Sequence, residues 1–250
     1  MQYLERLIRA YGYAIRQTIN SIKGSPQALL IVPIAGLIYS ISQMILSRMV
    51  GLSGLGGFIM PLINSAVLSV VLQSLLDLID YDSFSITKIR YTMAFTFLWD
   101  VYFIQFVLFL LGYVTNGLSI NASLFYIILF IVFSGIPEEI YLGKYRRMEL
   151  ITSQLDYLKR NFYIWLPIIL ALASVSERIA IVTNQMFVGW TIFGYHTGAF
   201  FIPTNNVSHL VLWLVFQMAL SIVVVLRGHL FKYTQYGNVR KDQYRQGMRG

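Results

Sequence analysis

The sequence of 250 residues contains no cysteine. That absence excludes a disulfide framework, a thiol nucleophile and a zinc–thiolate site. The sequence also lacks the short motifs G-x-S-x-G, H-E-x-x-H and G-x-G-x-x-G and the P-loop, each of which carries a known chemistry. The three histidines, His196, His209 and His229, lie far apart and have no ligand spacing. The sequence therefore predicts no catalytic residue, no metal site and no cofactor.

Charge is scarce as well. Charged residues make up 12% of the chain, against about 25% in a soluble domain, and the mean hydropathy is +0.65. Such a chain cannot cover a surface that faces water on all sides. Crossing about 30 Å of hydrocarbon takes roughly 20 apolar residues in a helix. Five segments without Asp, Glu, Lys or Arg are candidates for such crossings, namely residues 24–47, 49–76, 101–137, 161–176 and 179–226.

These patterns predict an all-α, polytopic integral membrane protein with six transmembrane helices. Amphipathic helices on the cytoplasmic surface are expected over residues 2–22, 84–93 and 137–162, giving three units of surface helix plus hairpin. Residues 1–226 are predicted to form a single membrane domain, and 227–250 a basic, mobile cytoplasmic tail. The predicted spans are about 27–47, 58–79, 94–114, 122–136, 162–183 and 207–226.

The distribution of basic residues predicts the orientation. All but two of the 19 lysines and arginines fall in the segments placed inside, and the exceptions are Arg48 in an outer turn and Arg178 within a span. By the positive-inside rule both termini are expected in the cytoplasm. The basic residues behind the net charge of +8 are expected to bind anionic lipid headgroups and other membrane or cytoplasmic proteins, and not nucleic acid. The candidates for this surface are Arg6, Arg9, Arg16, Arg146, Arg147, Lys159 and Arg160.

Polar residues inside the predicted spans are the other candidates for function. Asp100 is expected about 9 Å below the inner boundary of the third span, with Gln73 at a similar depth as a hydrogen-bond partner. Asp100 either takes part in a mechanism or only stabilises helix packing. Glu177 and Arg178 are expected near the outer end of the fifth span, where Glu177 could pair with Arg48.

Three further acids, Asp77, Asp80 and Asp82, cluster where the second span ends. They could bind a divalent cation in a membrane-embedded transferase. The alternative, favoured here, is that they are solvated residues that cap helix ends.

The segment that starts at Pro137 has a recognisable pattern. A Pro137-Glu138 pair closes an apolar run, Gly143 follows, and an amphipathic helix with Ser153 at its centre ends in Lys159-Arg160-Asn161-Phe162. This pattern resembles the six-span membrane domain attached to some bacterial glycerophosphodiester phosphodiesterases and found in related envelope proteins. The matching residues cover about 26 positions. The catalytic domain of the fused members has no counterpart here, so the resemblance implies a bacterial inner-membrane protein and carries over no catalytic residue.

Two functions compete after these exclusions. The first is a non-enzymatic membrane subunit or scaffold that assists lipid or envelope processes within a larger complex. The second is the permease subunit of an ATP-driven exporter, which six spans with both ends inside would suit. The long amphipathic helix between the fourth and fifth predicted spans favours the first.

Overall fold

The structure is a computed structural model that describes residues 2–49, 56–117, 128–129, 131–183 and 207–247. These residues are helical apart from short connections, and no strand occurs among them. The prediction of an all-α protein is confirmed. The α-helices are α1 (Gln2–Gly24), α2 (Ile31–Met49), α3 (Gly56–Tyr81), α4 (Met93–Thr96), α5 (Leu98–Gly117), α7 (Ile136–Leu142), α8 (Met148–Thr183) and α9 (Val207–Gly247), with 3-10 turns η1 (Pro26–Leu30) and η2 (Ile86–Lys88).

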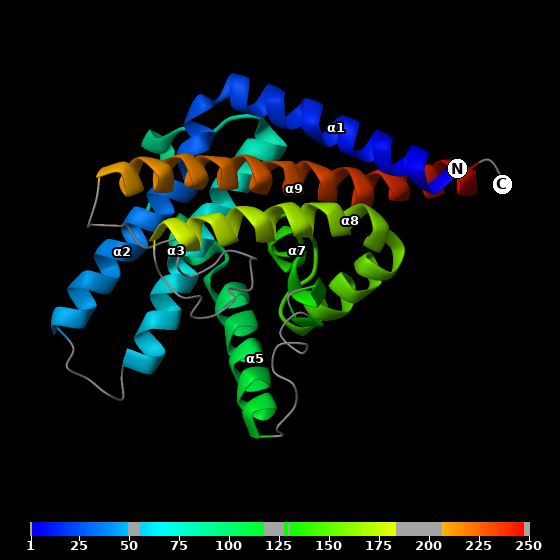
Figure 1. Ribbon diagram of the computed structural model, residues 1–250. Coiled ribbons are helices and arrows are strands. Elements are labelled where there is room, and N and C mark those ends of the chain that lie inside the picture. The colour runs from blue at the N-terminus through cyan, green and yellow to red at the C-terminus, as the bar shows by residue number, and fades with distance from the viewer. Residues whose placement is uncertain (1, 50–55, 118–127, 130, 184–206, 248–250) are drawn as a thin grey trace.

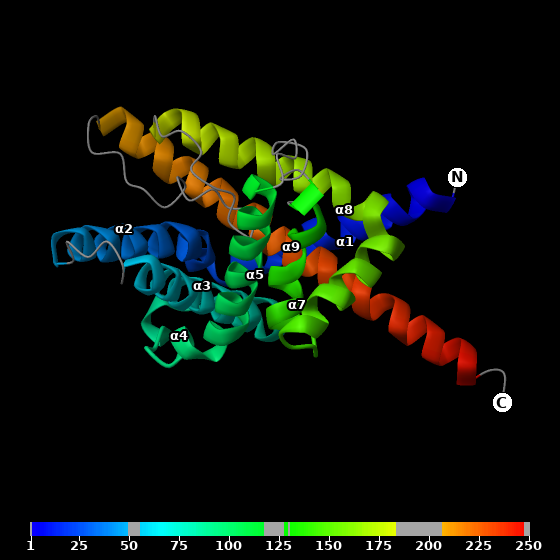
Figure 2. The same ribbon diagram turned by 90° about the horizontal axis from the view of Figure 1, so that it is seen from below.

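The helices form two groups. Helix α9 lies between α1 and α8 and runs antiparallel to both, whereas α2, α3 and α5 project away from this layer (Figure 1). Figure 2 gives the view from below, in which α2 and α3 lie side by side. Because the short helix α7 contacts α3, α8 and α9, it lies where the two groups meet.

The junction between α1 and α2 is a sharp corner. Helix α1 ends at Gly24, and Pro26 at the first position of η1 starts the next element, since proline fits a helix start but cannot continue a helix. The two segments Tyr3–Gly24 and Pro26–Tyr39 are bent by 100° relative to each other. The corner turns the chain out of the α1/α8/α9 layer into the second group.

Two described helices are long and apolar enough to cross a membrane, and the number becomes three if the bent α1–α2 pair counts as one crossing. They are Pro61–Tyr81 within α3 and Leu210–Gln235 within α9. A shorter apolar segment, Leu98–Leu111, lies in α5. These helices indicate association with a membrane. The six predicted spans and the positions of the termini stay predictions, and residues 122–127 and 130 of the predicted fourth span, 122–136, lie outside the described residues.

Two predicted boundaries are absent from the structure. The surface helix over 137–162 and the span over 162–183 were expected as separate elements, but from Met148 to Thr183 they form the single helix α8, which contains Pro167. The tail expected to begin at residue 227 instead continues α9 to Gly247. Its first residues are packed, since Arg227, Leu230 and Phe231 are buried. Burial of Leu230 and Phe231 explains the difference, because their apolar faces continue the stripe of the preceding helix.

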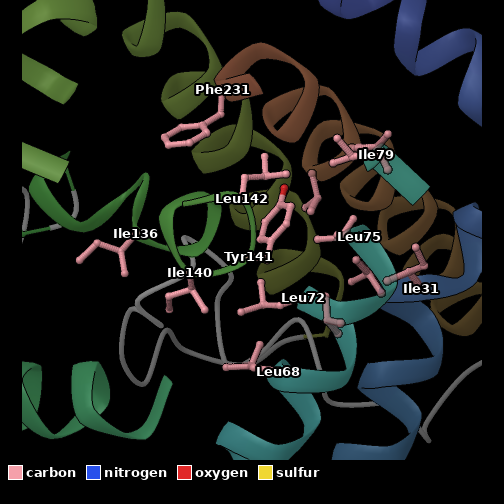
Figure 3. Packing of buried hydrophobic residues seen from close by; sticks show 14 of the residues in the cluster. Ile31, Leu68, Leu72, Leu75, Ile79, Ile136, Ile140, Tyr141, Leu142 and Phe231 are labelled. Carbon is pink, nitrogen blue, oxygen red and sulfur yellow. The ribbon is translucent and has the colours of Figure 1, made fainter. Parts of the chain in front are cut away.

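The core is centred on α3. Leu68, Leu72, Leu75 and Ile79 recur at the spacing of one helix face and are buried. Figure 3 shows this row next to the buried side chains of α7, together with Ile31 at the start of α2. The row extends the apolar core from the α2/α3/α5 group to α7 and α9, and it fixes α7 in place.

Candidate functional site

Helix α7 is the most unusual element in the described part of the chain, because it is short and wholly buried. Every residue from Ile136 to Leu142 is buried, including the adjacent carboxylates Glu138 and Glu139. Pro137 in the first turn favours the helix start. Gly143 ends the helix by donating its backbone N–H to the carbonyl oxygen of Glu139 at 2.9 Å. A side chain at Gly143 would overlap with the Glu139 backbone and carboxylate, so glycine permits this close approach.

Glu138 forms an ion pair with Arg227 of α9 inside the protein. The guanidinium Nη2 lies 2.7 Å from the carboxylate Oε2, and each side chain is only 2% exposed. The same nitrogen donates to the backbone carbonyl of Ser134. The ring of Trp165 lies 5.5 Å from the guanidinium carbon, which adds a cation–π contact. Burial raises the pKa of Glu138, and the charge and hydrogen bond of Arg227 oppose this rise.

Glu139 has a weaker set of partners. Its Oε1 accepts a hydrogen bond from the Ser153 hydroxyl at 2.8 Å, whereas its buried Oε2 has no hydrogen-bond partner among the described residues. Burial raises the pKa of Glu139, the Ser153 hydrogen bond lowers it, and the neighbouring Glu138 raises it further. The charge of Arg160 also lowers it, but burial is the largest influence, so the pKa of Glu139 lies above its ordinary value.

An aromatic cluster encloses the ion pair on the α8 side. The Tyr157 ring lies 4.6 Å from that of Phe231 and 5.5 Å from that of Trp165. Trp165 donates its indole N–H to the Ser134 hydroxyl at 2.9 Å, and the Tyr157 hydroxyl is 2.7 Å from that of Thr234. These contacts join α8 and α9 around the charges and exclude water from them.

A second polar cluster fixes the end of α3. The hydroxyl of Ser21 in α1 lies 3.0 Å from Nε2 of His229 and donates to Asp82 at 3.3 Å. The Nζ of Lys232 contacts Asp80 at 2.9 Å and the carbonyl of Ile79 at 2.9 Å. Asp82 bonds the serine and not the histidine, so this is not the order of a catalytic triad. Across the part of the chain that the structure describes, no group of three His, Cys, Asp or Glu could hold a metal ion.

The structure gives Asp100 and Gln73 other partners than the sequence predicted. Asp100, in the first turn of α5, pairs with Arg146 at 3.1 Å, and Gln73 donates to Asp77 at 3.0 Å. The predicted Gln73–Asp100 hydrogen bond is therefore wrong. Asp77 lies one turn along α3 and within reach of Gln73. Asp100 is paired by Arg146 from the loop before α8, a contact that no local pattern in the sequence indicates.

The other predicted candidates divide into two sets. Arg48, Glu177 and Arg178 lie outside the residues whose side chains the structure describes, so the Glu177–Arg48 pair stays a prediction. The seven basic candidates of the cytoplasmic surface are all exposed. Arg6 contacts Asn161 of α8 at 3.4 Å, and Arg146 and Arg147 share one cavity. Arg9 pairs with Glu5, and Lys159 pairs with Asp156. Arg160 donates to the backbone carbonyl of Asp156, and Arg16 completes the set.

Sequence reasoning missed the buried pair itself. Glu138 was expected to close an apolar run at the start of the surface helix over 137–162, and Arg227 to begin the tail. One signal was present: each is the first charged residue after a long uncharged segment, and the two charges have opposite sign. Charges at the ends of two apolar segments on the same membrane face are natural partners.

The chain matches no protein-family model, no curated protein and no solved structure. Its function is therefore argued from its own residues. The carboxylates of α7 are enclosed by helices and aromatic rings, so they can hold helices together but cannot meet a substrate as the structure stands.

Proposed function

We propose that the chain is a non-enzymatic integral membrane subunit or scaffold that assists lipid or envelope processes within a larger membrane complex. One observation carries this proposal. The buried ion pair of Glu138 and Arg227 lies inside the protein and joins α7 to α9, so its charged groups are not presented to a substrate. The surface carries many exposed apolar side chains together with exposed basic residues, and both suit contact with lipid and with other proteins.

The exposed apolar residues support a membrane setting. Helix α1 exposes Leu4, Ile8, Ile15 and Ile19, each more than 45% accessible. The same helix carries Arg6, Arg9 and Arg16. Apolar and basic residues on one helix are the pattern of a segment that lies in the membrane interface and meets anionic headgroups. The proposed location is the cytoplasmic membrane of a bacterium, with both termini in the cytoplasm, in keeping with the distribution of basic residues.

The experiment is purification of the tagged chain in mild detergent, followed by native mass spectrometry of the bound lipids and proteins. We expect a defined protein partner in fixed ratio, and retention of phosphatidylglycerol over phosphatidylcholine. The variant Arg6→Gln/Arg9→Gln/Arg16→Gln should weaken that lipid preference, because it removes three charges near the surface.

A matched control removes three charges from exposed positions outside α1, as Lys88→Gln/Arg90→Gln/Lys144→Gln does. Loss of anionic lipid preference in the control as strong as in the α1 variant would argue against α1 as the lipid surface. A chain that retains neither protein nor anionic lipid would contradict the proposal. Copurification of an ATPase in fixed ratio would favour the permease alternative instead.

A further inference from the structure

A cavity of about 670 Å³ lies where the start of α5 faces the loop that leads into α8. Its size is within the range of about 300–1,000 Å³ that ligand sites occupy. It is separate from the enclosed ion pair of α7 and opens to the surface. The lining residues are Thr96, Trp99, Asp100, Arg146, Arg147, Met148 and Glu149.

Arg146 is held in place on one wall of this cavity. Its Nη1 donates to Asp100 at 3.1 Å and to the carbonyl oxygen of Ile140 at 3.1 Å. The Phe97 ring lies 5.7 Å from its guanidinium carbon. Because Asp100 compensates its charge and three contacts fix its position, Arg146 presents remaining N–H donors in a set direction.

Arg147 and Glu149 are the charges that remain uncompensated. Both side chains are exposed, and among the described residues neither has a hydrogen-bond or ion-pair partner, including each other. Arg147 has a backbone φ of 52°, a left-handed conformation that is unfavourable for arginine. The cavity therefore carries one free positive and one free negative charge on neighbouring parts of its wall.

Two large exposed side chains, Trp99 and Met148, border this pair of charges. Trp99 is 65% exposed and Met148 66% exposed. Trp99 is the second residue of α5 and of the apolar segment Leu98–Leu111. Exposed tryptophan at the end of an apolar helix is typical of the membrane interface.

We propose that this cavity binds the headgroup of a phospholipid that carries both a phosphate and a primary ammonium, as phosphatidylethanolamine does. Arg147, assisted by Arg146, would bind the phosphate, and Glu149 would accept hydrogen bonds from the ammonium. The inference rests on the proposed membrane function and deepens it by naming one lipid class and its site.

The charge balance favours this class over an anionic lipid. With Asp100 and Arg146 paired, a zwitterionic headgroup would satisfy both Arg147 and Glu149, whereas an anionic headgroup would leave the Glu149 carboxylate next to a like charge. A choline headgroup is the sharpest competitor. It has the same phosphate and could stack on Trp99, but its quaternary ammonium has no N–H to donate to Glu149.

The test measures retention of lipids by the full chain from equimolar phosphatidylethanolamine and phosphatidylcholine in native mass spectrometry. We expect phosphatidylethanolamine to be retained about tenfold more, the effect of one charge-assisted hydrogen bond. Glu149→Gln should reduce this ratio to about one. Arg147→Gly should reduce retention of both lipids, and since glycine accepts a positive φ, this variant should fold at least as well as the parent.

The matched controls are Asp156→Asn in α8 and Arg90→Gln after η2, which make the same charge changes on exposed positions outside the cavity lining. They should leave the lipid ratio unchanged. Equal retention of the two lipids by the parent chain, or an unchanged ratio in Glu149→Gln, would overturn the site. Millimolar O-phosphoethanolamine should compete for the cavity, because it carries the same phosphate and primary ammonium. Binding of this ester by a chain that retains no phosphatidylethanolamine would show that a soluble phosphate ester, not a lipid, is the ligand.

Failure of this inference is distinguishable from failure of the proposed function. If the ethanolamine preference is missing but the chain still binds a protein partner and prefers phosphatidylglycerol through α1, only the cavity assignment fails. If the partner and the anionic lipid preference are also missing, the proposed function fails with it.

Discussion

Arg227 is the residue whose replacement should damage the fold most. Its loss would leave Glu138 buried without a cation, which costs about 3–5 kcal/mol of unfolding free energy. We expect Arg227→Met to lower the midpoint of thermal unfolding by about 2–4 °C for each kcal/mol lost. The measurement is tryptophan fluorescence of the protein in detergent during heating. The double variant Arg227→Met/Glu138→Leu should recover most of that loss, because it removes both charges together.

The pair formed by Lys232 and Asp80 supplies the control for this experiment. Its Nζ–Oδ1 distance of 2.9 Å is similar, but both side chains are 37% exposed. Lys232→Met should therefore cost about 0–1 kcal/mol. A double variant at Glu138 and Arg227 as unstable as Arg227→Met alone would mean that the ion pair itself, and not the relief of a buried charge, stabilises the junction.

Glu139 should make stability depend on pH. Its pKa in the folded protein is raised above the ordinary value of 4.5 by burial, so the folded state binds the proton more tightly than the unfolded state does. The resulting penalty is absent below the ordinary pKa, grows as pH rises through the raised pKa, and is full above it. Glu139→Gln, which retains an acceptor for Ser153, should remove this penalty.

The measurement for Glu139 is the difference in unfolding midpoint between Glu139→Gln and the parent at pH 5 and pH 8. We expect the variant to gain more at pH 8. Glu149→Gln on the exposed start of α8 is the control and should show little change in the difference. An advantage that is larger at pH 5 would contradict a raised pKa of Glu139 in the folded protein.

At the scale of the elements, the contact of α9 with α3 and α7 depends on Gly228. A Cβ there would overlap with the Ile79 side chain and the Tyr141 hydroxyl. Gly228→Ala should therefore lower the unfolding free energy by about 1–3 kcal/mol, as overpacking does. Gly12→Ala in α1 is a matched control, since nothing lies within 4 Å of its Cβ position.

The two alanine variants should move stability in opposite directions. Alanine is the better helix former, so Gly12→Ala should gain about 0.5–1 kcal/mol. The comparison uses thermal unfolding of both variants under the same conditions. Equal and positive shifts would show that α9 does not approach α3 and α7 as closely as the structure has it.

The elements also show how far the sequence predicted the fold. Apolar runs and helix-period patterns located α1, α3 and α5 to within a few residues, because hydrophobic periodicity is a local property. The continuity of α8 and α9 was missed for the opposite reason. Whether the chain bends at Asn161 or Arg227 depends on tertiary partners, and Arg227 continues the helix because Glu138, 89 positions away, lies opposite it.

The candidate site was predicted less well than the fold. Composition identified residues that would be exposed and basic, and these are at the surface. Pairings between distant residues were not predictable, as the partner of Asp100 shows: Arg146 reaches it only because α7 is buried and brings the following loop back over the start of α5. Local patterns carry no information on such folding back of the chain.

At the scale of the whole molecule, the number of membrane crossings determines where the termini lie. An even number of crossings leaves both termini on one face of the membrane, whereas an odd number places them on opposite faces. Three crossings would result if α3, α9 and the bent α1–α2 pair each cross once. The chain has no cysteine, so single-cysteine variants can report the side of each position without background. We choose Thr87→Cys in the predicted cytoplasmic turn η2 and Asn205→Cys in the predicted outer segment.

In intact cells, a membrane-impermeant maleimide should label Asn205→Cys at once and Thr87→Cys only after permeabilisation. Cysteines added before Met1 and after Gly250 should behave like Thr87→Cys, because the positive-inside rule places all three on the face that gathers the lysines and arginines. Labelling of one terminus but not the other would require an odd number of crossings. That result would remove the common cytoplasmic face on which α1 and the start of α8 are proposed to meet lipid, since the cavity and the α1 arginines could then lie on opposite sides of the bilayer.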